Sequence, residues 1–163
     1  MDMFPRIRVE RAMLLLPAIA SATPARVRAA VLRTWWNGWV TKRRFQQRSR
    51  GCIFGCDYPD SIEHYAYCPV VAEFGSRFLG LGRAEDPVAD FMVLSPRYTS
   101  ADQAVLVRKA VRVAAVYKLH CSVRHRPSGA AATLRPETLF QTAREIARGH
   151  AKVCQILDCA FSR

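Results

Sequence analysis

The sequence predicts a mainly α-helical protein, and three of its features lead to this expectation. Apolar residues recur at three- and four-residue spacing over most of the 163 residues, which is the period of a helix. Alternation of apolar and polar residues, which would indicate a half-buried strand, is limited to a short piece at 91–94. Three cysteines and one histidine lie close together within residues 51–69, so a small cysteine-rich module interrupts the helices.

Composition narrows the class of protein. Half of the residues are hydrophobic, so a chain of this length can form one folded domain with a core. The net charge is +12, and such a field attracts polyanions, nucleic acid ahead of an anionic membrane, although a solvated basic surface is the common alternative. No apolar stretch reaches the length of a membrane span, so no span is expected.

The cysteines and the charge of the N-terminal third give information on the cellular compartment of the protein. Three of the six cysteines lie in the cysteine-rich module and there is no signal-peptide hydrophobic region, which favours an intracellular, reducing compartment. Residues 11–50 contain no Asp or Glu, a feature shared with organelle transit peptides. The choice between nucleus, cytoplasm and organelle therefore stays open.

The first elements are a basic extension and a long helix. Residues 1–22 are predicted as a basic N-terminal extension, because Pro5 and Pro17 interrupt the periodicity and arginines supply the charge. A helical domain over 23–125 follows. A Thr-Pro pair at 23–24 caps and opens its first helix, which the apolar spacing carries to the mid-forties.

The end of this predicted helix combines aromatic and basic residues. Trp35, Trp36 and Trp39 cannot share one helix face, so part of this surface must meet a second element or a ligand. Five of the nine residues at 42–50 are basic, and arginine pairs with phosphate while aromatic rings stack on bases. A solvated helix face is the alternative. The predicted nucleic-acid contacts are Lys42, Arg43, Arg44, Phe45, Arg48, Arg50, Trp35 and Trp39.

The module at 51–69 has the spacing C-x3-C-x7-H-x3-C, formed by Cys52, Cys56, His64 and Cys68. Thiolate and imidazole are the ligands that Zn2+ selects, and four of them close a tetrahedron without an open position, as in a structural site. Either Asp60 or Ser61 can cap a short helix that places His64 and Cys68 on one face, and Gly55 can take a positive φ between the first two cysteines. Three buried reduced cysteines and an unrelated histidine are the alternative. We expect a helical domain with a small inserted Cys3His zinc-knuckle module.

Helices and linkers complete the chain. A short helix is expected over 70–79, and residues 83–99, with the acidic residues Glu85, Asp86 and Asp90, read as a surface loop. A capping box at 100–103 opens the central core helix, which extends to about residue 124. Residues 126–135 are a linker, and 136–163 form one C-terminal helix that packs on the domain and carries Cys154 and Cys159 as core thiols.

The knuckle resembles a known family. Its four ligands, with Glu63 before the histidine and Pro69 after the last cysteine, resemble the zinc-binding region downstream of the polymerase in non-LTR (LINE-type) retrotransposon reverse transcriptases. The preceding segment at 33–45, RTWWNGWVTKRRF, is similar to the one leading into that finger in retroelement-derived proteins of protists, dinoflagellates in particular. The resemblance covers roughly 24–125 and implies that the knuckle helps to hold template RNA or target DNA. The chain has no polymerase motif of the Tyr/Phe-x-Asp-Asp type, so it resembles a retroelement tail without the polymerase.

Two functions from different classes remain. The first is a non-catalytic, zinc-dependent nucleic-acid-binding protein derived from a reverse-transcriptase tail, with RNA favoured over DNA. The second is a structural, arginine-rich subunit of a large ribonucleoprotein such as an organellar ribosome, with protein neighbours around it. An enzyme is not expected, because the four zinc ligands leave no open position and the other histidines lack partners at a motif spacing.

Overall fold

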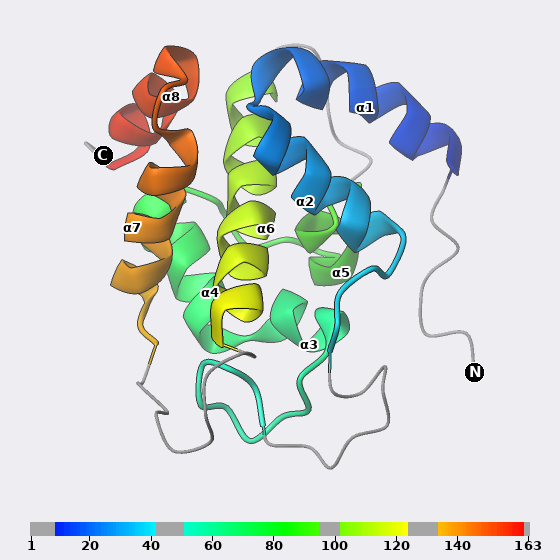
Figure 1. Ribbon diagram of the computed structural model, residues 1–163, viewed down its shortest axis with the longest axis vertical. Helices are drawn as coiled ribbons and strands as arrows, with labels where there is room; N and C mark the ends of the chain where they lie inside the picture. Colours follow the sequence, from blue (N-terminus) through cyan, green and yellow to red (C-terminus); the bar gives the residue numbers. More distant parts are fainter. Residues whose placement is uncertain (1–8, 42–50, 95–101, 124–133, 162–163) are drawn as a thin grey trace.

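A computed structural model describes residues 9–41, 51–94, 102–123 and 134–161, and these residues form helices without a strand (Figure 1). The prediction of a mainly α fold is confirmed. In chain order the elements are α1 (Val9–Ala22), α2 (Ala25–Trp35), α3 (Ile62–Tyr67), α4 (Pro69–Glu73), the π-helical turn η1 (Phe74–Phe78), α5 (Pro87–Phe91), α6 (Gln103–Val123), α7 (Pro136–Ala147) and α8 (Ala151–Phe161).

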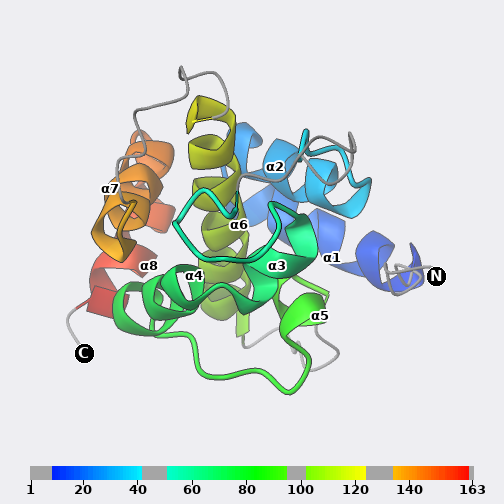
Figure 2. The same cartoon turned by 90° about the horizontal axis from the view of Figure 1, so that it is seen from below.

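Helix α6 is the centre of the fold. Figure 1 shows it between α2 on one side and α7 and α8 on the other, and Figure 2 shows α3, α4 and α5 along a further side. Its middle is buried almost all round, because helices pack against several of its faces. The predicted central core helix is therefore confirmed. Among the described helices, none has the length and apolarity needed to cross a membrane.

The predicted N-terminal extension contains a packed helix. Helix α1 continues through Pro17, so the prediction that this proline breaks the structure is wrong. The physical reason is an apolar stripe formed by Leu15, Ile19 and Ala22, which are all buried. The free energy gained by their burial offsets the loss of the backbone hydrogen bond that proline cannot donate. Residues 1–8 lie outside the described part of the chain.

Helix α2 ends at Trp35, about ten residues before the predicted end. Asn37 takes a positive φ of 49°, its amide donates to Thr34 O at 3.1 Å, and the Gly38 amide donates to Arg33 O at 2.6 Å. These two bonds form a Schellman turn, the common way in which a residue in the left-handed region stops a helix. A side chain at Gly38 would meet Arg33 O at 3.2 Å, so glycine suits the close approach. Residues 42–50 follow outside the described residues.

The turn carries Trp39 into the core. Its side chain is fully buried, and its ring lies 5.2–6.4 Å from the rings of Tyr65, Phe91, Tyr117 and His120. Trp35 is also buried, and its indole Nε1 donates to Met92 O at 2.6 Å. The prediction that Trp35 and Trp39 stack on nucleic-acid bases is wrong, because both indoles already pack inside the protein.

The predicted surface loop at 83–99 contains helix α5. Asp86 caps this helix by accepting a hydrogen bond from the Ala89 amide at 3.0 Å. The short piece at 91–94 is the end of α5 and a turn in which Val93 has a φ of 62°, so the predicted strand is wrong. Residues 95–99 lie outside the described residues.

Asp90 is buried rather than exposed in a loop. One carboxylate oxygen pairs with Lys109, and the other accepts from Arg112 Nη2 at 2.9 Å. Arg112 also donates to Asp90 O, so α5 is held to α6 by both the side chain and the backbone. Two cations compensate one buried carboxylate, as burial of such a charge requires.

The C-terminal region consists of two helices. Gly149, with a φ of 84°, separates α7 from α8, so the single helix predicted for 136–163 is wrong. Arg26 of α2 donates to Ile146 O and Arg148 O, two backbone oxygens at the end of α7. Cys159 is exposed, which contradicts the prediction of a core thiol, whereas half-buried Cys154 donates to Ala147 O. Most of the predicted linker lies outside the described residues, which resume at 134.

Trp39 and Trp36 provide a matched test of this fold. We expect Trp39→Ala to lower the free energy of unfolding by about 3–5 kcal/mol, because it removes a fully buried indole. Trp36→Ala should change it by no more than about 0.5 kcal/mol, because that side chain is exposed. Denaturant titration of the two variants measures both values. Equal losses would contradict the packing described here.

Candidate metal centre

The first two cysteines are brought together by a tight loop. The Cys52 amide donates to Tyr58 O at 2.8 Å, and the Gly55 amide donates to Cys52 O at 2.9 Å. Gly55 has a φ of 85°, the positive value expected from the sequence. A Cβ on Gly51 would lie 2.6 Å from Cys56 O, so glycine is required where the loop crosses itself. The loop therefore places the thiols of Cys52 and Cys56 on the same side of its backbone.

The other two predicted ligands come from α3 and the residue that follows it. Ser61 is the N-cap of α3, and its hydroxyl accepts a hydrogen bond from the His64 amide at 3.1 Å. Cys68 ends α3 and precedes Pro69, the first residue of α4. His64 and Cys68 therefore lie one helical turn apart on the same side, as their four-residue spacing predicts. Of the two possible caps, Ser61 is the one used.

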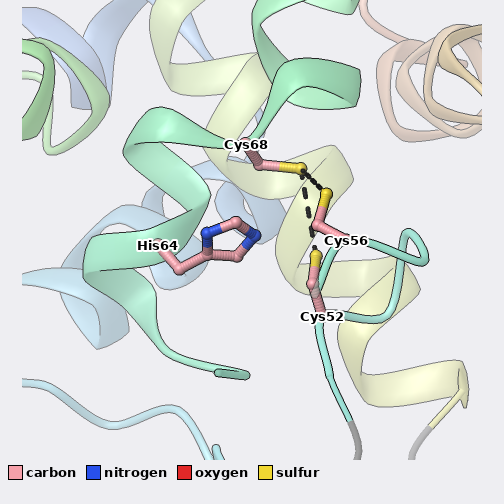
Figure 3. Close-up of side chains that lie close together, drawn as sticks. All are labelled: Cys52, Cys56, His64 and Cys68. Carbon is pink, nitrogen blue, oxygen red and sulfur yellow. Dashed lines mark hydrogen bonds between the residues drawn. The ribbon is translucent and has the colours of Figure 1, made fainter. Parts of the chain in front are cut away.

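The four side chains converge on one point (Figure 3). One ligand atom from each of Cys52, Cys56, His64 and Cys68 lies within 4.8 Å of every other. The Sγ atom of Cys68 lies 3.9 Å from that of Cys52 and 3.5 Å from that of Cys56. Cys56 is partly exposed and the other three are buried. This group is close enough to hold a metal ion.

His64 fits the role of a metal ligand. Its Nε2 atom is buried and has no hydrogen-bond partner among the described residues. The ring stacks on Tyr58, with centroids 5.3 Å apart and planes inclined by 13°, which fixes its orientation. A buried nitrogen without a partner costs about 1–3 kcal/mol, and a metal ion among the three sulfur atoms would supply the missing interaction.

The three thiols have unequal acidity. Hydrogen bonding from the Cys52 thiol lowers the pKa of Cys68 to about 5, with a contribution from the backbone amide of Val71. The same contact with Cys68 raises the pKa of Cys52, and burial raises the pKa of Cys56. Cys68 is therefore the thiol of the three that ionises most readily. A cation that binds here replaces the thiol protons of Cys52 and Cys56.

A buried polar cluster joins the knuckle to the helical core, and its role was not anticipated from the sequence. Asp60 accepts a hydrogen bond from the Tyr65 hydroxyl, and its other oxygen lies 3.5 Å from His120 Nε2 on α6. All three side chains are almost completely buried. The sequence offered Asp60 only as a helix cap. Its contact with His120, sixty residues later, depends on how α3 packs against α6 and has no local signature.

The structure brings together only part of the predicted functional set. The four predicted metal ligands form one group, whereas Trp35 and Trp39 belong to the core. The predicted contacts Lys42, Arg43, Arg44, Phe45, Arg48 and Arg50 all lie outside the described residues. Trp36, which was not among the predicted contacts, is 74% exposed.

Comparison with protein-family models, with curated proteins and with solved structures found no match to this chain. The resemblance to the zinc-binding region of LINE-type reverse transcriptases therefore stays a prediction, which depends on the knuckle spacing and on the segment at 33–45. The geometry of the four ligands is independent of that resemblance, because it follows from the loop at 51–58 and from α3.

Removal of one ligand tests the metal centre. We expect Cys56→Ser to release the bound metal and to expose the amides of residues 51–69 to hydrogen exchange, because three ligands do not close the site. Cys159→Ser is the matched control, since that thiol is exposed and outside the group. Metal content by elemental analysis and amide exchange by mass spectrometry measure the outcome. Unchanged metal content in Cys56→Ser would exclude this centre.

Metal binding should also depend on pH. Cys52 and Cys56 have raised pKa values and are protonated near neutral pH, whereas Cys68, with a pKa of about 5, is already ionised. Binding should therefore release about two protons from the thiols, and the apparent affinity should rise about a hundredfold per pH unit and fall on acidification. Calorimetry in buffers of different ionisation enthalpy measures the protons released. Binding without proton release would show that the thiols are not the ligands.

Proposed function

We propose that this chain is a non-catalytic, zinc-dependent nucleic-acid-binding protein that binds RNA in preference to DNA. The observation that carries the proposal is the Cys3His group placed directly after the most basic stretch of the chain. The group would act as a structural clamp, and the basic residues would contact phosphate. Origin from a retroelement reverse-transcriptase tail is part of the proposal and depends on the resemblance given above.

The donor set and its spacing support zinc. Zinc bonds to sulfur at about 2.3 Å in a tetrahedron, which puts two sulfur ligands about 3.8 Å apart. The two Sγ–Sγ separations from Cys68, 3.9 Å to Cys52 and 3.5 Å to Cys56, lie close to this value. Three thiols and one imidazole would fill all four positions, so the ion would stabilise the fold and have no place for a substrate. Zinc ligation needs reduced thiols, which suits a reducing intracellular compartment.

The position of the basic run supports binding to nucleic acid. Thr41, just before the run, is buried, and Cys52, just after it, is a member of the metal group. The residues that flank this run on both sides therefore belong to the folded protein, and the metal ion would fix the position of Cys52. Arginine pairs with phosphate through two parallel hydrogen bonds. The net charge of +12 adds a long-range attraction to a polyanion.

A separate observation supports the second candidate, a structural subunit of a large ribonucleoprotein. Helix α1 exposes two adjacent apolar side chains, Met13 at 65% and Leu14 at 71%. Neighbouring exposed apolar residues suit a permanent protein contact better than free diffusion. The two candidates differ in solution behaviour, because a subunit of an assembly would aggregate or lose stability without its neighbours, whereas a binding module would stay monomeric.

Charge removal in the basic run tests the proposed function. We expect the triple variant Arg43→Gln, Arg44→Gln and Arg48→Gln to weaken RNA binding and to reduce the slope of log affinity against log salt by about 2, because each phosphate contact on a single strand contributes about 0.7. The measurement is fluorescence anisotropy of a labelled RNA across a salt series with the zinc-loaded chain.

The control removes the same charge from another surface. Arg135, Arg144 and Lys152 are exposed residues in or beside α7 and α8. Their triple Gln variant lowers the net charge by the same amount. It therefore measures how much RNA affinity is lost through the change in net charge alone. Equal losses in the two variants would place the interface outside residues 42–50, and absence of RNA binding by the zinc-loaded chain would refute the proposed function.

A further inference from the structure

Trp36 is the most exposed large hydrophobic side chain in the described part of the protein, at 74%. It lies between two buried tryptophans, Trp35 at 5% and Trp39 at 0%. Leaving an apolar ring of this size in water forgoes about 1.5–3 kcal/mol of burial free energy. Packing has therefore placed the two other indoles in the core and left this one in water.

The backbone around Trp36 is held rigidly. Its amide donates to Leu32 O at 3.0 Å, and the Schellman turn at Asn37 and Gly38 follows directly. On either side, the Trp35 indole bonds to the backbone of Met92, and the Trp39 indole bonds to the Thr34 hydroxyl at 2.9 Å. Trp36 cannot turn inward without withdrawing one of these two indoles from the core. The backbone that carries the exposed indole is therefore fixed, and only the two side-chain torsions of Trp36 have to be ordered when a ligand binds.

A cation lies beside this surface. Arg33 precedes Trp36 by three residues, so both project from the same exposed side of α2. Its guanidinium donates to the Tyr117 hydroxyl and lies 5.6 Å from the centre of that ring, which fixes where the charge points. Helix α2 contains no acidic residue, and none occurs anywhere in residues 11–50. The charged residues of 11–50, the stretch that contains Trp36, are thus all basic, as suits contact with a polyanion.

We infer that the Trp36 indole is the platform on which an unpaired base of single-stranded RNA stacks, and that Arg33 contacts a phosphate of the same strand. Stacking needs an accessible aromatic face, which a paired base inside a duplex does not offer. This inference rests on the proposed nucleic-acid binding and specifies its ligand as unpaired RNA. No Asp or Glu occurs in residues 11–50, so this part of the chain offers a basic protein partner no opposite charge.

Binding of a short unstructured RNA and of its blunt duplex to the zinc-loaded full chain tests the inference. Trp36→Ala should weaken binding of the single strand by roughly 5- to 150-fold, as expected for one stacked base, and should leave duplex binding nearly unchanged. Trp36→Phe should restore most of the affinity, because an aromatic face remains. Leu14→Ala is the matched control, since it removes an equally exposed apolar side chain from α1.

Fluorescence gives a second readout that a merely structural role of Trp36 would not change. The chain has three tryptophans, and Trp36 is the exposed one, so the single strand should quench its emission by stacking. Quenching should disappear in Trp36→Phe. Arg33→Gln should lower the salt slope by about 0.7, and Tyr117→Phe, which keeps the charge but removes its hydrogen-bond partner, should leave the slope unchanged.

The outcomes separate this inference from the proposed function. Loss of single-strand affinity and of quenching in the Trp36 variants, with Leu14→Ala unchanged, is the expected result. RNA binding that is indifferent to Trp36→Ala but sensitive to the basic-run variant would overturn the inference and leave the proposed function standing. A wild-type oligomer that Trp36→Ala dissociates in sedimentation would instead make this surface a contact between copies of the chain. Absence of RNA binding by the wild type would refute both this inference and the proposed function.

Discussion

Burial of the Trp39 indole is the interaction on which the arrangement of the helices depends. Its ring contacts Tyr65 of α3, Phe91 of α5, and Tyr117 and His120 of α6, while its Nε1 atom donates to Thr34 of α2. One side chain thus joins four helices from distant parts of the sequence. The Schellman turn at the end of α2 makes this possible, because the chain must leave the helix for Trp39 to point into the core.

The candidate metal centre is built locally but supported by the core. The loop at 51–58 and the Ser61 cap bring the four ligands together with bonds between residues close in sequence. The position of the whole module is set by distant partners, since Tyr65, next to a ligand, packs on Trp39 and bonds to Asp60, which faces His120. A bound ion would therefore stabilise both the module and its attachment to α6.

The distribution of charge separates two halves of the molecule. In the C-terminal half acidic groups lie next to basic ones: Asp90 pairs with Lys109 and Arg112, Glu145 with Lys118, and Asp158 with Arg144. Residues 11–50 hold nine arginines and lysines and no acidic residue. Unbalanced positive charge is thus most concentrated in residues 11–50 of the sequence, which include the exposed Trp36.

The sequence alone determined the helical class, the long α6 and the Cys3His group that could hold a metal ion, because helical periodicity, N-caps and ligand spacing are local properties. The sequence predicted too great a length for α2 and for the C-terminal helix. A single residue with a positive φ, Asn37 or Gly149, stops a helix that the apolar spacing would continue. Tertiary structure decided the rest. Only packing selects which of Trp35, Trp36 and Trp39 stays in water, because burial depends on the neighbours that α3, α5 and α6 supply and not on the spacing of the tryptophans themselves.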